Sequence, residues 1–313
     1  MTLPRYRDLP RADPIDAAHA WDVFGRDDEL GRVNLITPQT VAAAGAEVQA
    51  GRVFNVCLPL NLPDPPWEHS RGALRHEVLV VDRNTQDDVI RDFYPQTSTQ
   101  WDGLRHVRAR ELGFYGGRGD DTAGPGGGEL GIERWVEHGI AGRGVVADVA
   151  AHLERQGRPL DARVGTPIMV ADLQATLHGA GVELRDGDIL LVRTGYLTAY
   201  KAASEAERAD FAVNRDGPGL FAGEEMAEFL WDAGVAVVAT DNPAVEVVPG
   251  SKEAGSLHRR LIPLLGFLLG ELFDLDALAA DCAADGRYTC FFVAAPLNVP
   301  GGVGSPGNAV AIK

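Results

Sequence analysis

The amino-acid sequence predicts an α/β fold, with a mixed β-sheet at the core and helices flanking it. Two observations lead to this prediction. Strand-like and helix-like segments alternate along the 313 residues, with no repeat or heptad pattern among them. Hydrophobic residues make up 45% of the chain and charged residues 24%, a composition typical of globular proteins. A chain of this length can bury a large core.

One helix start near the N-terminus and four strand segments give clear signals. A helix is expected to begin at Pro38 and to end at Gly51, because Thr37 is a favourable N-cap and proline is favoured at the first helical position. Two strand segments are rich in β-branched residues, and two are short apolar runs between turn residues, as in buried strands. They are residues 53–58 and 77–82, and residues 144–149 and 188–194, respectively.

The rest of the chain continues the alternation of helices and strands. Thr166 and Pro167 predict the start of a helix that runs to about His178, where Gly179 or Gly181 ends it. The hydrophobic periodicity of the later segments predicts three more helices and three more strands. The helices are residues 222–233, 257–269 and 275–284, and the strands are residues 235–240, 288–295 and 309–313.

Two stretches are expected to be irregular. Residues 113–131 contain nine glycines and are predicted to form either a flexible lid over a pocket or a plain surface loop. Residues 63–72, rich in proline and charge, are candidates for the border of a substrate cleft. For the domain organisation, we predict an N-terminal helical extension over residues 1–50 and an α/β domain over residues 51–313.

The charge of the chain excludes some classes of partner. The net charge is −16, which argues against nucleic acid and against anionic membranes, since both favour a basic protein surface. The N-terminus shows no secretory signal, and the longest apolar run, residues 261–270, is too short to cross a bilayer. We therefore expect a cytoplasmic protein that acts on a small molecule.

The most informative motif lies between Gln96 and His106, which read Q-x-S-T-Q-x-D-x-x-x-H. It resembles H-x-G-T-H-x-D-x-x-x-H, the metal-site signature of the cyclase family, which includes bacterial kynurenine formamidase and isatin hydrolase. Six further segments resemble that family in the right order, and the resemblance covers the chain from about residue 50. One of them is V-A-T-D at 238–241, which resembles a family strand that ends in G-x-D. The other five are G-R-G-V-V-A-D-V at 142–149, G-D-I-L-L-V-R-T-G-Y at 187–196, P-G-L at 218–220, H-R-R-L-I…E from 258 to 271, and P-L…G-S-P from 296 to 306.

The resemblance implies a fold, a metal site and an oligomeric state. It places metal ligands at Asp102, His258 and Glu271, and it makes His106, with Asp102 beside it, the acid or base. The two signature histidines that would also bind metal fall on Gln96 and Gln100, whose amide oxygens are poorer ligands than imidazole nitrogens. We therefore expect one divalent ion, Mn or Zn, or no metal. Family members are commonly homo-oligomers, so a homodimer or homotetramer is expected.

Three functional hypotheses follow. The first is a metal-dependent hydrolase that cleaves the C–N or C–O bond of an amide, lactam or lactone, with His106 as proton shuttle. The second is a metal-independent cyclase, isomerase or dehydratase, in which Gln96 and Gln100 hold a substrate oxygen and His106 moves protons. The third is an inactive homologue that only binds its ligand. Gln96, Gln100 and Trp101 are the candidate substrate-binding residues.

Overall fold

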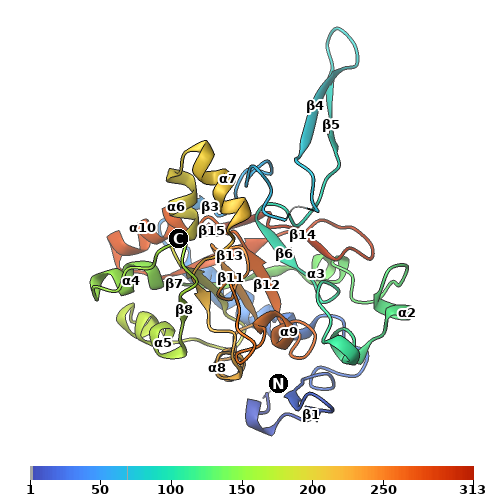
Figure 1. Ribbon diagram of the computed structural model, residues 1–313, viewed down its shortest axis with the longest axis vertical. Coiled ribbons are helices and arrows are strands. Elements are labelled where there is room, and N and C mark those ends of the chain that lie inside the picture. The colour runs from blue at the N-terminus through green and yellow to red at the C-terminus, as the bar shows by residue number, and fades with distance from the viewer. Residues whose placement is uncertain (1–2, 69) are drawn as a thin grey trace.

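The computed structural model describes residues 3–68 and 70–313, and in this part of the chain the core is a nine-stranded mixed sheet (Figure 1). The predicted fold class is therefore confirmed. Four central strands, β12, β11, β9 and β7, run parallel, and the outer strands are antiparallel to their neighbours. The spatial order is β14 (Gly304–Pro306), β6 (Gln100–Asp102), β12 (Leu268–Glu271), β11 (Val237–Thr240), β9 (Ile189–Arg193), β7 (Ile140–Asp148), β13 (Thr289–Ala294), β15 (Ala309–Ile312) and β3 (Val53–Asn55).

Helices surround this sheet, and several of them are short (Figure 1). The α-helices are α1 (Pro38–Ala44), α2 (Asp120–Ala123), α3 (Glu133–His138), α4 (Val149–Arg155), α5 (Val170–Gly179), α6 (Tyr196–Ala202), α7 (Glu205–Val213), α8 (Glu224–Asp232), α9 (Leu257–Leu261) and α10 (Asp276–Asp285). The 3-10 helices are η1 (Tyr6–Asp8), η2 (Gly31–Leu35), η3 (Gly45–Glu47), η4 (Arg110–Leu112) and η5 (Tyr115–Gly117). Small two-stranded sheets pair β1 (Arg11–Ala12) with β2 (Ala17–Ala18), β8 (Pro167–Ile168) with β10 (Gly219–Leu220), and β4 (Arg75–Val80) with β5 (Gln86–Arg91).

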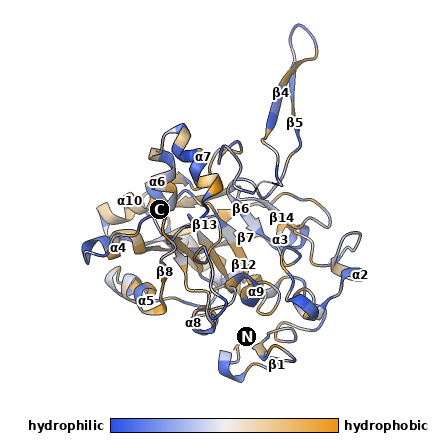
Figure 2. Cartoon of the chain, in the orientation of Figure 1, coloured by the Kyte–Doolittle hydropathy of each residue, from blue (hydrophilic) through white to orange (hydrophobic). Residues whose placement is uncertain are grey.

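The central strands are buried because their sequences are apolar along their whole length. Every residue of β11 is buried, as are the first four of β9. Parallel strands that are covered on both faces show this continuous pattern instead of an alternating one. Figure 2 shows hydrophobic residues, in orange, among the strands at the centre of the molecule. The buried strands predicted for these segments are confirmed.

Three predicted helix boundaries are wrong. The helix predicted over residues 257–269 ends at Leu261, because Pro263 and Gly266 interrupt it, and its apolar continuation joins the sheet as β12. Residues 167–168 form β8, so that α5 begins only at Val170, where the side chain of Asp172 accepts a hydrogen bond from the Met169 amide at 3.3 Å. The first α-helix ends at Ala44 and continues as a 3-10 turn.

The N-terminal residues pack against the body of the fold. The guanidinium of Arg32 is fully buried between the rings of Trp231 and Phe267, at 4.4 and 4.5 Å from their centroids. Tyr6 and Val33 contribute to the same hydrophobic core as the central sheet. The predicted division of the chain at residue 50 stays a prediction, as does the homo-oligomeric state.

A two-stranded arm, β4–β5, projects from the body and carries exposed side chains on β4 throughout (Figure 1). It contains the predicted strand at residues 77–82, shifted by two residues. The chain leaves β5 and runs directly into the segment that contains Gln96 and Gln100, so the base of the arm adjoins the signature motif. No helix in the described part of the chain is long and apolar enough to span a membrane.

Candidate active site

Strands β6 and β12 bring three of the predicted residues to one face of the sheet. Glu271 lies directly opposite Gln100 in the antiparallel pair, and Leu269 lies opposite Asp102. Because side chains alternate along a strand, Gln100 and Asp102 share a face. The Gln100 amide nitrogen donates a hydrogen bond to Glu271 Oε2 at 2.6 Å. Glu271 stands at the carboxyl end of the parallel strand β12, the edge of an α/β sheet at which ligands usually bind.

His258 completes the cluster from the first turn of α9. The helix begins there because Ser256 is its N-cap and accepts a hydrogen bond from the Arg259 amide. His258 Nε2 lies 3.1 Å from Glu271 Oε1 and 3.7 Å from Asp102 Oδ2. One ligand atom from each of Asp102, His258 and Glu271 lies within 4.8 Å of the others. The structure therefore brings together the three residues that the resemblance named as metal ligands.

Glu246, which the sequence analysis missed, holds His258 from behind. Its carboxylate accepts hydrogen bonds from the His258 amide at 2.7 Å and contacts Nδ1 of the same ring at 3.2 Å, while Ser256 Oγ donates to its other oxygen. An ionised carboxylate can only accept, so Nδ1 carries a proton and donates it to Glu246. Nε2 is then directed at the cluster. A carboxylate behind the ring is the usual support for a histidine that binds metal through its other nitrogen.

Gln96 connects Asp102 to His106. Its amide nitrogen donates to Asp102 Oδ1 at 2.6 Å and contacts His106 Nδ1 at 2.9 Å. The carboxylate fixes the orientation of the amide, since only the nitrogen can donate to it. His106 Nδ1 therefore accepts, and the proton of the neutral ring is on Nε2. His106 follows β6 in a turn, in which its amide donates to the Gly103 carbonyl, so Asp102 and His106 do not share a helix.

The electrostatics of the cluster favour a cation. Burial opposes the charge of Asp102, but His106, His258 and Gln96 outweigh it and hold the pKa of that carboxyl below its usual value. Burial and the neighbouring Asp102 raise the pKa of Glu271 to about 7. Burial also opposes the charge of His258, yet its carboxylate neighbours, Asp102 first, raise its pKa well above 6.5. Protons bound to Glu271 and His258 thus compensate for the negative charge of the carboxylates that converge at this point.

The donor set fits one divalent cation. Asp102 Oδ2 and Gln100 Oε1 are both buried, and neither has a hydrogen-bond partner among the described residues. A buried oxygen without a partner destabilises the fold by about 1–3 kcal/mol unless a donor or a cation contacts it. Asp102, His258 and Glu271 supply one nitrogen and two oxygens, a set that suits Mn or Zn, and the Gln100 oxygen is a further candidate ligand, since its amide nitrogen is bonded to Glu271. Gln96 does not belong to this set, because its amide nitrogen faces Asp102 and His106.

The role of Glu246 leads to a first prediction. Glu246→Gln is expected to weaken the binding of Zn or Mn by about 10- to 100-fold, the usual effect of losing the carboxylate behind a metal-bound histidine. The affinity is measured by competition with a chelating dye. Glu68→Gln is the matched control, since Glu68 is an acidic residue nearby that does not contact His258. An unchanged affinity in Glu246→Gln would show that His258 is not a ligand.

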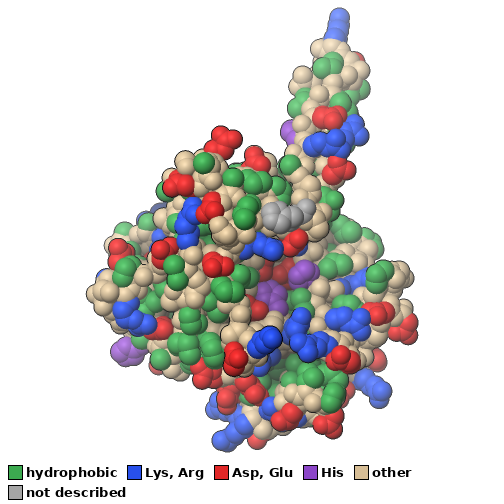
Figure 3. All heavy atoms as spheres, in the orientation of Figure 1, with side chains coloured by type: hydrophobic (Ala, Val, Ile, Leu, Met, Phe, Trp, Pro, Cys, Tyr) green, Lys and Arg blue, Asp and Glu red, His purple; other side chains and the backbone are tan. Residues whose placement is uncertain are grey.

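A cavity of about 190 Å³ opens beside the cluster. Figure 3 shows this region as a hollow with histidine side chains at its floor and Lys or Arg side chains around it. The volume is below the roughly 300–1,000 Å³ of sites for drug-sized ligands, which indicates a small metabolite. Its lining residues are Trp67, Glu68, Arg71, Gln96, Thr97, Gln100, His106, Arg215, Pro243, Glu271 and Leu272.

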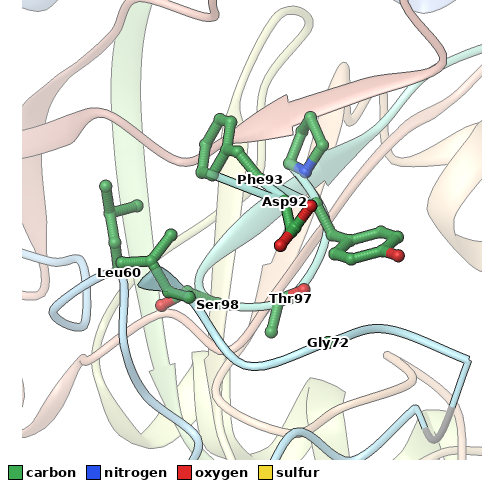
Figure 4. A pocket seen from close by; sticks show the side chains of 9 residues that line it. Leu60, Gly72, Asp92, Phe93, Thr97 and Ser98 are labelled. Carbon is green, nitrogen blue, oxygen red and sulfur yellow. The ribbon is translucent and has the colours of Figure 1, made fainter. Parts of the chain in front are cut away.

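A second, smaller cavity lies at the base of the β4–β5 arm (Figure 4). Leu60, Phe93 and Ser98 line it, and Thr97 lines both cavities. Its volume is about 10 Å³, which is room for a single water molecule. This cavity is therefore too small for a substrate, and the larger one is the candidate site.

Trp101 is a correction to the predicted substrate-binding set. Its side chain is fully buried on the opposite face of β6 from Gln100 and Asp102, where it packs against Phe273 and Phe292. Gly270 makes room for it, since a Cβ at that position would lie 2.6 Å from the indole ring. Trp101 therefore positions the strand and does not line the cavity.

Of the two stretches predicted to be irregular, one lines the cavity and the other does not. Residues 63–72 border the cavity through Trp67, Glu68 and Arg71, as predicted for a cleft border, although residue 69 lies outside the described residues. No residue from 113–131 lines the cavity. That stretch contains a short helix, α2, and Arg105 anchors it by donating to carbonyls at its centre. Of the two predicted alternatives, the structure favours the plain surface loop over the lid.

Comparison with known proteins identifies the family. The model of the Cyclase family matches residues 23–247. The chain belongs to the cyclase family. A solved structure described as a novel cyclase is 33% identical over 94% of this chain and 99% of its own, with a TM-score of 0.83. A search of curated proteins found no match.

More distant solved structures share the fold. Isatin hydrolase A from Labrenzia aggregata, bound to benzyl benzoate, is 17% identical with a TM-score of 0.59, over 87% of this chain and 97% of its own. A predicted metal-dependent hydrolase from Bacillus stearothermophilus is 17% identical with a TM-score of 0.51, over 84% of this chain and 98% of its own. At this identity the likeness concerns the fold alone.

Proposed function

We propose that this cyclase-family protein is a metal-dependent hydrolase of a small-molecule amide, lactam or lactone. The observation that carries the proposal is the convergence of Asp102, His258 and Glu271 on one point, with Glu246 accepting from Nδ1 of His258 so that Nε2 is the nitrogen that faces the cluster. Two structural neighbours, an isatin hydrolase and a predicted metal-dependent hydrolase, support the same reaction class.

The residues divide the work of the proposed reaction. A divalent cation held by Asp102, His258 and Glu271, with the oxygen of Gln100, would polarise a carbonyl and lower the pKa of a bound water. Glu271 keeps Gln100 in place through the hydrogen bond from the Gln100 amide. Gln96 holds His106 through Nδ1, which leaves the Nε2 proton available to the leaving nitrogen or oxygen of a substrate in the cavity.

The metal-independent alternative receives less support from the geometry. It requires the amides of Gln96 and Gln100 to donate hydrogen bonds to a substrate oxygen. The Gln96 nitrogen already donates to Asp102 and His106, and the Gln100 nitrogen already donates to Glu271. An amide nitrogen has only two protons, so Gln96 has none left for a substrate. The inactive, ligand-binding alternative makes no use of the ordered Gln96–His106 contact.

The test is a hydrolysis assay with the purified protein supplied with Mn or Zn. The panel contains matched N-formyl amines, aryl lactams and lactones of similar size. The proposal predicts turnover of at least one class, its loss on chelation, and its recovery when the metal is restored. No turnover of any class by the metal-loaded protein would contradict it. Isomerisation or dehydration that is insensitive to chelators would establish the metal-independent alternative.

A further inference from the structure

Two arginines line the cavity of an otherwise strongly acidic protein. Arg71 and Arg215 both border it, whereas the chain as a whole has 45 acidic and 29 basic side chains. The other charged side chains of the lining, apart from His106, are the carboxylates Glu68 and Glu271. Two cationic groups at one small cavity therefore do not reflect a generally basic surface.

The guanidinium of Arg71 is available to bind an anion, in both its charge and its hydrogen-bond donors. Its Nη1 donates to the main-chain carbonyl of Gln96, a neutral acceptor. Among the described residues it forms no ion pair, and Nε and Nη2 have no hydrogen-bond partner. The bond to Gln96 fixes the guanidinium beside the residue that bridges Asp102 and His106. An anchored guanidinium with open donors in a cavity is a preorganised binding site for an anion.

Arg215 is held only by an exposed ion pair. Its Nη1 lies 3.1 Å from Glu68 Oε2, and the two side chains are 46% and 43% exposed. Exposed pairs of this kind contribute about 0–1 kcal/mol, so a ligand can displace Glu68 at little cost. Arg71 thus supplies the fixed contact, and Arg215 can supply a second one as the ligand enters.

We propose that the substrate of this site carries a carboxylate, which Arg71 binds and Arg215 secures, while its hydrolysable carbonyl lies toward Glu271 and His106. The proposal rests on the proposed function and names its substrate class. A guanidinium presents parallel N–H donors that match the two oxygens of a carboxylate. The cavity of about 190 Å³ suits a small acid of this kind. Neutral lactams and esters of the same size are then the poorer substrates.

The test compares two ligands that differ only in the anion, N-formylglycine and N-formylglycinamide. Binding is measured by calorimetry and hydrolysis by formate release, in the wild type and in Arg71→Gln and Arg71→Lys. The wild type is expected to prefer the acid, and Arg71→Gln to lower that preference by about 10- to 100-fold, the value of a charged hydrogen-bonded pair. Arg71→Lys keeps the positive charge but lacks the parallel N–H donors of a guanidinium. It should therefore recover part of the preference for the acid.

Two controls separate the possible causes. Arg91→Gln removes an ion-paired arginine on the β4–β5 arm that is about as exposed as Arg215, and it should leave the preference unchanged. Binding is repeated in Asp102→Asn, in which a carboxylate that bound directly to a metal would lose its site. A preference for N-formylglycine over N-formylglycinamide that persists in Asp102→Asn but is lost in Arg71→Gln supports the proposal. Acid preference that disappears only in Asp102→Asn overturns it, as does tighter competition by inorganic phosphate than by N-formylglycine.

The outcomes also separate this proposal from the hydrolase itself. Efficient hydrolysis of the neutral formamide, with Arg71→Gln equal to wild type on both ligands, overturns the carboxylate proposal and leaves the hydrolase standing. Binding of N-formylglycine that depends on Arg71, without any formate release from metal-loaded protein, supports the carboxylate site and counts against hydrolysis.

Discussion

Asp102→Asn is expected to lose the bound metal and to reduce turnover at least about 10³-fold. Asp102 contributes the orphaned Oδ2 to the cluster, and its neighbours keep its pKa low, so it is the most strongly ionised ligand available. Asparagine has the same shape but no charge. Polarisation by a metal is worth several kcal/mol of the barrier, and each 1.36 kcal/mol is a factor of ten in rate. The measurements are metal content by mass spectrometry and initial rates on the best substrate of the panel.

The fold of Asp102→Asn should persist, since an amide oxygen can still accept the hydrogen bond from Gln96. Asp241→Asn is the matched control. Asp241 is also a buried carboxylate at this edge of the sheet, but it accepts hydrogen bonds from Thr194 and the Gly195 amide. That variant should melt at lower temperature and keep its metal. Full metal content and wild-type turnover in Asp102→Asn would remove Asp102 from the proposed site.

His106→Gln is expected to lower turnover by about 10²- to 10⁴-fold while the metal content stays at the wild-type value. The reason is that His106 lines the cavity and contacts Gln96, but does not belong to the ligand set of Asp102, His258 and Glu271. Loss of a general acid or base has effects of this size. Rates and metal content are measured on the same preparation, so that the two effects can be separated.

His152→Gln is the control for this substitution. His152 lies on α4 and contacts Gln156, away from the cavity lining. It should have wild-type turnover. If His106→Gln also loses metal, His106 is a ligand and not the proton shuttle. If it keeps full turnover, proton transfer occurs at another residue.

Much of the sheet was predictable because its strands carry local signals. The apolar runs of β9 and β11 are bounded by turn residues, and both strands were expected near their observed positions. The strand β12 was mistaken for the end of a helix, because residues 261–269 carry no polar side chain and periodicity alone does not distinguish a buried strand from a buried helix. Its pairing with β11 and β6 comes from tertiary structure.

The site residues depended on two different sources of information. Asp102, His258 and Glu271 came from resemblance to the cyclase family, and no local pattern would have joined residues so far apart in the sequence. Glu246 was missed, because its contact with His258 arises only when the two segments meet in the folded chain. Arg71 was covered only as part of the predicted cleft border at residues 63–72. The error at Trp101 was avoidable. The order Gln100-Trp101-Asp102 alternates between polar and apolar, and in a strand this places the indole on the other face.

The most direct test of the account is the metal content of the wild-type protein, purified without an affinity tag and then titrated with Mn and Zn. We predict about one equivalent of tightly bound metal per chain, since ligand atoms of Asp102, His258 and Glu271 lie together at a single site. Protein that contains no metal, and takes up none on titration, would contradict the account.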